Sequence, residues 1–161
     1  MGALGASKAQ SLGAPSEVSS SFTTSFVLNI INYLKNACNV KNNGKITIPI
    51  AVVVGKLDML EDLWGSGMKV FEPSRHSSTG CFVESEADRI HLEMASWLNQ
   101  HGDNLTKLFD ENFKTWKYFG ISSYGRQPKQ GHIVSDISPL RVLDPLIWNL
   151  SLEGIVKKVS K

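Results

Sequence analysis

The sequence predicts an α/β fold, because two apolar runs have the pattern of buried strands and stretches with helical periodicity surround them. The first run, residues 46–54, consists mainly of β-branched residues with almost no polar interruption. Such a run is typical of a central strand that is covered on both faces in a parallel sheet. The second run, residues 116–122, also leads into a small polar loop. Two strands that each end in such a loop indicate an α/β layer protein.

Apolar residues that recur at three- and four-residue spacing predict helices around these strands. The first helix is expected over residues 25–38 and leads into the first strand. Two more are expected between the strands, one starting near Ser85 with an acidic first turn and one capped by Asp103. Asp144 followed by Pro145 predicts a last helix to about residue 159, since proline is favoured at the first helical position.

The stretch between the first strand and the Ser85 helix has a weaker pattern. A short strand is expected over residues 68–71, and a polar loop over residues 73–80. His76 lies in that loop without a second ligand-type residue at metal spacing, so a solvated histidine is predicted rather than a metal ligand. Cys38 and Cys81 are far apart and have no CxxC partner, so no metal site and no disulfide scaffold is expected.

Length and composition are those of one soluble domain, with 161 residues, of which 42% are hydrophobic and 20% charged. The Gly/Ala/Ser-rich segment 1–24 is expected to be flexible, and residues 25–161 to form a single α/β domain. A net charge of +2 gives no electrostatic reason to expect nucleic acid as a partner. No apolar run approaches the roughly 20 residues that span a membrane, and the N-terminus has no secretory signal pattern, so a cytoplasmic location is expected.

The two polar loops carry short motifs that resemble those of a known family. The first loop reads Gly-Lys-Leu-Asp over residues 55–58, and the second reads Ser-Ser-Tyr-Gly over residues 122–125. With the intervening helices and the RVLDPLIWNL segment of the last helix, they resemble the C-terminal half of a Ras-like P-loop GTPase domain. The likeness is closest to the bacterial double-GTPase type and covers about residues 22–159. It implies a partial three-layer P-loop GTPase-like sheet flanked by helices.

The resemblance assigns roles to the loop residues. In the family pattern NKxD, the aspartate accepts two hydrogen bonds from guanine N1 and N2, and the lysine stem lies along the base and sugar. Asp58 and Lys56 match these positions, whereas Gly55 replaces the asparagine and removes a hydrogen bond that tethers the loop. Ser122 and Ser123 match the serine-alanine motif that places a backbone N–H near the guanine carbonyl oxygen, with Ser123 replacing alanine. GTP or GDP, weakly bound, is the implied ligand.

The elements that handle phosphate in this family are missing from the sequence. It contains no GxxxxGK[ST] motif, no identifiable switch threonine and no strand ending in DxxG, on which phosphoryl transfer depends. Residues 2–8 come nearest to a phosphate-binding loop, but they lack the glycine before Lys8 and the hydroxyl after it. The sequence therefore predicts a GTPase-like fragment that does not hydrolyse GTP as an isolated chain. The intact protein could still be a GTPase, with the phosphate half supplied from elsewhere.

A second interpretation stays open beside the first. The chain could be a non-catalytic interaction module that kept the α/β layer and lost the nucleotide, since a lysine and an aspartate after a buried strand are common loop residues. A truncated sheet would expose an edge strand or an apolar face. Pairing with a second copy or docking on another protein could cover it, so a homodimer or a protein partner is the expected assembly.

Overall fold

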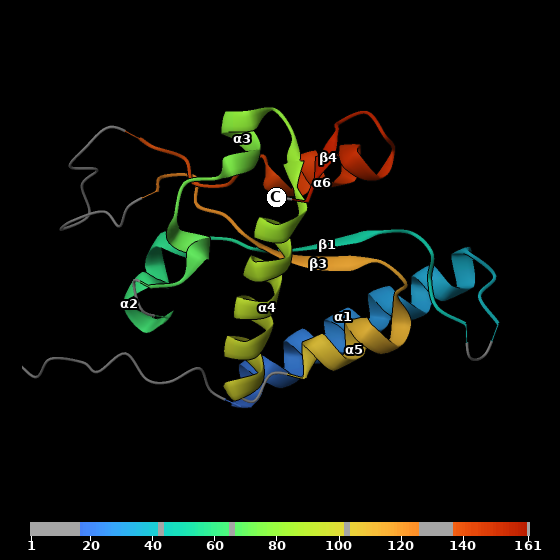
Figure 1. Ribbon diagram of the computed structural model, residues 1–161. Coiled ribbons are helices and arrows are strands. Elements are labelled where there is room, and N and C mark those ends of the chain that lie inside the picture. The colour runs from blue at the N-terminus through green and yellow to red at the C-terminus, as the bar shows by residue number, and fades with distance from the viewer. Residues whose placement is uncertain (1–16, 42–43, 65–66, 102–103, 126–136, 161) are drawn as a thin grey trace, which may run out of the picture.

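The computed structural model describes residues 17–160, apart from 42–43, 65–66, 102–103 and 126–136 (Figure 1). Within this part of the chain the fold is mixed α/β, with two small sheets of two parallel strands each. The larger sheet pairs β1 with β3 and the smaller pairs β2 with β4, these strands being Ile50–Val54, Trp116–Gly120, Phe82–Val83 and Lys158–Val159. The predicted α/β class is confirmed at this level.

The β1–β3 sheet contains the two strands that the sequence predicts, in shorter form. Ile46, at the start of the predicted strand, is fully buried but forms only an isolated parallel bridge with Phe113. Pro49 separates this bridge from β1, and its missing N–H is compatible with a position just before the paired residues. The expectation that the strand is covered on both faces is wrong at Val53, whose side chain is 43% exposed.

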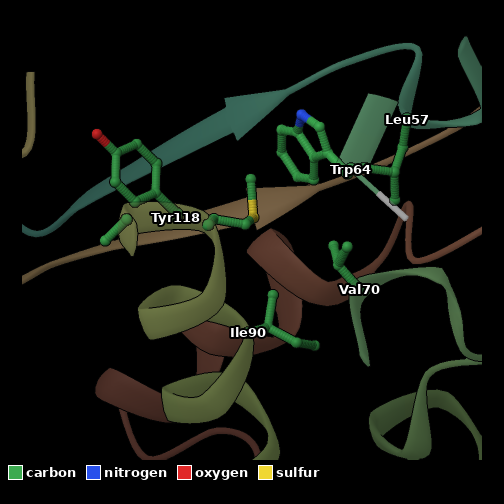
Figure 2. Close-up of a cluster of buried hydrophobic side chains, with 7 residues drawn as sticks. Leu57, Trp64, Val70, Ile90 and Tyr118 are labelled. Atoms are coloured by element: carbon green, nitrogen blue, oxygen red, sulfur yellow. The ribbon is translucent and has the colours of Figure 1, made fainter. Parts of the chain in front are cut away.

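Helices pack on both faces of this sheet through the side chains of alternate strand residues. The face that carries Val52 and Tyr118 packs against α4 (Glu84–Gln100), and Figure 2 shows part of the resulting core. The same face extends to α1 (Glu17–Ala37) and α5 (Leu105–Asn112), which lie side by side in Figure 1. The opposite face, with Phe119, packs on Trp148 of α6 (Asp144–Leu152).

The outer helices differ from the prediction at their ends. α1 begins at Glu17, so the segment 17–24 is helical, although it was predicted to belong to the flexible region 1–24. Residues 1–16, which include the loop-like stretch 2–8, lie outside the described part of the chain. α6 ends at Leu152 because Gly154 adopts a left-handed φ of 73°, and residues 158–159 form β4 instead of a last helical turn. None of the helices described has the length and apolar character needed to cross a bilayer.

Short helices occupy the region between β1 and β2. The chain leaves β1 through a 3₁₀ helix and a single α-helical turn, η1 (Leu57–Met59) and α2 (Glu61–Trp64). The stretch predicted to be a strand near residue 70 is a second 3₁₀ helix, η2 (Lys69–Phe71). The stretch predicted to be a polar loop contains α3 (Arg75–Thr79).

His76 is part of this correction, because it is 1% exposed rather than solvated. Its ring stacks on Phe82 with the ring centroids 4.9 Å apart. Its Nδ1 accepts a hydrogen bond of 2.9 Å from the backbone N–H of Val83. His76 is therefore a core residue that links α3 to β2, directly before α4 begins.

Candidate functional site

The loops that follow β1 and β3 lie next to each other, because parallel neighbouring strands end at the same edge of their sheet. Backbone hydrogen bonds continue the pairing past both strands. Ile121 N–H donates to Val54 C=O at 2.9 Å, and Leu57 N–H donates to Ile121 C=O at 3.0 Å. This pairing brings the residues of the first loop into contact with those of the second.

Asp58 and Ser122 form the polar centre of this edge. The Ser122 hydroxyl donates a hydrogen bond to Oδ1 of Asp58, and the same Oγ accepts one of 2.8 Å from Gly125 N–H. Asp58 is 7% exposed and Ser122 is fully buried, so each needs such partners to offset the loss of water. Ser122 is also held by its backbone, which exchanges two hydrogen bonds with Leu140 at 3.0 and 2.8 Å. One serine thus fixes both the aspartate and the shape of its own loop.

Lys56 and Ser123, the other two residues assigned from the sequence, are exposed at the rim of this pair. Lys56 precedes η1 in a left-handed conformation, with φ 55° and ψ 41°. This conformation costs a residue with a Cβ roughly 1–2 kcal/mol. The structure therefore brings Asp58 and Ser122 into direct contact and leaves Lys56 and Ser123 open to solvent.

Gly55 stands where the family pattern has an asparagine, and there is room for a side chain there. A Cβ built on Gly55 would meet no heavy atom within 4 Å, and its φ lies outside the left-handed region. The position could therefore accept a Cβ without a clash or backbone strain.

A buried ion network is centred on Arg141, and no local pattern in the sequence predicts it. Arg141 is 5% exposed, and its Nη1 donates to Oε1 of Glu86 at 2.8 Å and to Oδ2 of Asp144 at 2.9 Å. Its Nε and Nη2 donate to the backbone carbonyls of Val70 and Lys69 at 3.0 and 3.1 Å. One guanidinium therefore ties together η2, α4 and the start of α6.

The backbone connects this network directly to the candidate site. Arg141 directly follows Leu140, the residue whose backbone pairs with Ser122. On its other side Asp144 accepts a hydrogen bond of 2.5 Å from the Ser74 hydroxyl. Glu86 lies in the first turn of α4, which was predicted to be acidic, and Asp144 is the first residue of α6, but their shared cation was not predicted. The only hint in the sequence is the three-residue spacing of Arg141 and Asp144 at a helix entry.

Acid pH is expected to destabilise the fold through His76 and His91. Burial lowers the pKa of both rings, and in each ring Nδ1 accepts a backbone N–H, from Val83 and from Tyr118, which only an unprotonated nitrogen can do. The lower pKa in the folded chain does not change the free energy of unfolding while both histidines are neutral in the folded and in the unfolded chain. As pH falls below about 6.5, the unfolded chain binds protons first and the free energy of unfolding decreases.

Urea denaturation at about pH 7.5 and about pH 5.5 measures this decrease. The substitution His91→Gln is expected to make the decrease smaller, whereas His101→Gln, at an exposed position, serves as the control. A free energy of unfolding that stays constant or rises toward acid pH would contradict the assignment.

Among the residues that the structure describes, no group of three or more His, Cys, Asp or Glu side chains is placed to hold a metal ion. Comparisons of this sequence with family models, of the chain with curated proteins and of the fold with solved structures find no match. The function is therefore inferred from the residues and their geometry.

Proposed function

We propose that this chain is a fragment of a GTPase-like domain that recognises the guanine base through Lys56, Asp58, Ser122 and Ser123 and does not hydrolyse GTP by itself. One observation carries this proposal. The Ser122 hydroxyl holds the Asp58 carboxylate at the carboxyl ends of two adjacent parallel strands, where α/β proteins bind ligands.

The chemistry of this pair suits guanine better than adenine. A carboxylate only accepts hydrogen bonds, and guanine offers two donors side by side, N1–H and the N2 amino group. Adenine presents an unprotonated N1 at the equivalent edge, so an acceptor would face an acceptor. Because Asp58 is already oriented by Ser122, little ordering would accompany binding. The exposed Lys56 has the length to lay its stem along the base.

Calorimetry with GTP, GDP and ATP, combined with a phosphate-release assay, tests the prediction that the site lacks contacts to the phosphates. We expect weak or undetectable binding of guanine nucleotide at micromolar concentration, and no phosphate release, because the contacts to the phosphates are missing. Micromolar binding of GTP that is lost in Asp58→Ala would show that the chain holds a complete nucleotide site and would contradict this part of the proposal.

The substitution Gly55→Asn is expected to strengthen guanine binding by about two- to tenfold, since one added hydrogen bond is worth about 0.5–1.5 kcal/mol. The position has space for a Cβ, and an asparagine can supply the loop-tethering hydrogen bond that glycine lacks. NMR titration with GDP measures the change, and Gly55→Ala is the matched control without polar atoms. An equal gain in Gly55→Ala, or an equal gain for ADP, would contradict the tethering role.

The second candidate function, an interaction module, is favoured by a different observation. In the part of the chain that the structure describes, β1 pairs with β3 along one edge and with no strand along the other. An unpaired edge exposes backbone donors and acceptors that another strand can bind. The two functions do not exclude each other, because the open edge and the Asp58–Ser122 pair involve different residues.

A further inference from the structure

The open edge of β1 can be assigned to particular backbone groups. Ile50 N–H donates to Thr115 C=O at 3.1 Å, and Val54 C=O accepts from Ile121 N–H at 2.9 Å, so both residues point their backbone toward β3. Successive residues of a strand point to opposite edges. Ala51 and Val53 therefore direct their N–H and C=O groups away from β3, where the described residues provide no backbone partner.

The outer edge of β3, in contrast, has a hydrogen-bond partner among the described residues. There, Tyr118 N–H donates to Nδ1 of His91 at 3.1 Å. His91 belongs to α4, which packs on the face that carries Tyr118, so a side chain of this helix satisfies this N–H. In the described part of the chain, a helix side chain thus satisfies a backbone donor on the outer edge of β3, whereas the outer edge of β1 has no backbone partner.

β1 also lacks the features that usually keep an open edge from pairing. Its sequence, Ile-Ala-Val-Val-Val, contains no charged residue, and proline occurs only before it, at Pro49. Natural edge strands typically carry a lysine, a proline or a bulge to prevent such pairing. In addition, Val53 and the preceding Ile48 are 43% and 44% exposed. β1 is thus apolar and partly exposed, and among the residues that the structure describes its outer edge is unpaired.

We propose that β1 pairs with β1 of a second copy of this chain, antiparallel, about a two-fold axis at Val52. The edge is self-complementary, because its two outward-pointing residues, Ala51 and Val53, are equally far from Val52. Each Ala51 then lies opposite Val53 of the second copy, and the two pairs can exchange their N–H···O bonds. The same register sets Lys56 across from Ile48, so like charges do not oppose each other along the edge. This inference specifies the partner in the second candidate function and is independent of guanine recognition.

Sedimentation of the full chain over about 1–100 µM tests the proposal. The expected mass rises with concentration from 17.7 kDa toward twice that value. Val53→Lys and Val53→Glu are each expected to remain monomeric, because two like charges would lie diagonally about 7–8 Å apart across the new pair. An equimolar mixture of the two variants is expected to regain the dimer. Leu92→Lys, at a 65% exposed position of α4, is the matched control and is expected to behave like the unmodified chain.

Recovery of the dimer on mixing shows that both variants are folded and that the interface contains Val53 from each copy. A chain that is monomeric at the highest concentration, or a dimer that persists in Val53→Lys, would overturn the proposal. Concentration-dependent protection of the Ala51 and Val53 amides from hydrogen exchange is a second expected result. A monomer that binds guanine nucleotide would contradict the dimer alone, and a dimer with no base preference would contradict guanine recognition alone.

Discussion

Arg141→Met is expected to lower the free energy of unfolding by about 3–5 kcal/mol, the range found when one partner of a buried ion pair is removed. The variant leaves the carboxylates of Glu86 and Asp144, 8% and 3% exposed, without their shared cation. It also removes the donors to the backbone carbonyls of Lys69 and Val70. Methionine fills a similar volume, so the loss measures the network rather than a cavity.

Urea denaturation at neutral pH measures this effect, with Arg141→Lys as the matched control. Lysine keeps the charge but cannot donate in four directions at once, so an intermediate loss is expected. Adding Glu86→Gln and Asp144→Asn to Arg141→Met is expected to recover part of the loss, because no buried charge then lacks a partner. A decrease of less than about 1 kcal/mol in the free energy of unfolding of Arg141→Met is what the loss of an exposed ion pair would cause. It would contradict the stabilising role of this network.

Asp58→Ala is expected to abolish the preference for guanine over adenine nucleotide and to weaken guanine binding by at least about tenfold. A hydrogen bond to a charged group contributes about 1.5–3 kcal/mol, and two such bonds are proposed at this carboxylate. The variant also leaves the buried Ser122 hydroxyl without its acceptor, so a modest loss of stability accompanies the loss of recognition.

The controls for this prediction separate recognition from folding. Asp58→Asn keeps the shape and one acceptor oxygen and is expected to reduce the preference without a comparable loss of stability. Ser122→Ala keeps the carboxylate but removes the hydroxyl that orients it, so a smaller reduction is expected. An Asp58→Ala variant that still prefers GDP to ADP would show that the base is recognised by other residues.

The fold class and the two loops were predictable because their signals are local. A β-branched run predicts the strand that became β1, and the polar residues that follow it predict a ligand site at its carboxyl end. The structure shows a hydrogen bond between the Ser122 hydroxyl and Asp58, whereas the roles in guanine binding that the resemblance implies for these two residues stay predictions.

Other features depend on contacts between distant segments and could not be read from local patterns. His76 lies in a run of polar residues, and only packing against Phe82 makes it a core side chain. Arg141 finds its partners more than 50 residues away in Glu86 and in the backbone of η2. α6 is shorter than predicted because the helix ends before Gly154, whose left-handed conformation the local apolar pattern does not reveal.

An NMR titration of the ¹⁵N-labelled chain with millimolar GDP, and separately with ADP, tests the central claim most directly. Guanine recognition predicts shifts for GDP in the amides of residues 55–59 and 121–125, at the ends of β1 and β3, and much smaller shifts for ADP. Equal responses to the two nucleotides, or a GDP response confined to other surfaces, would contradict the assignment of this edge as a guanine site.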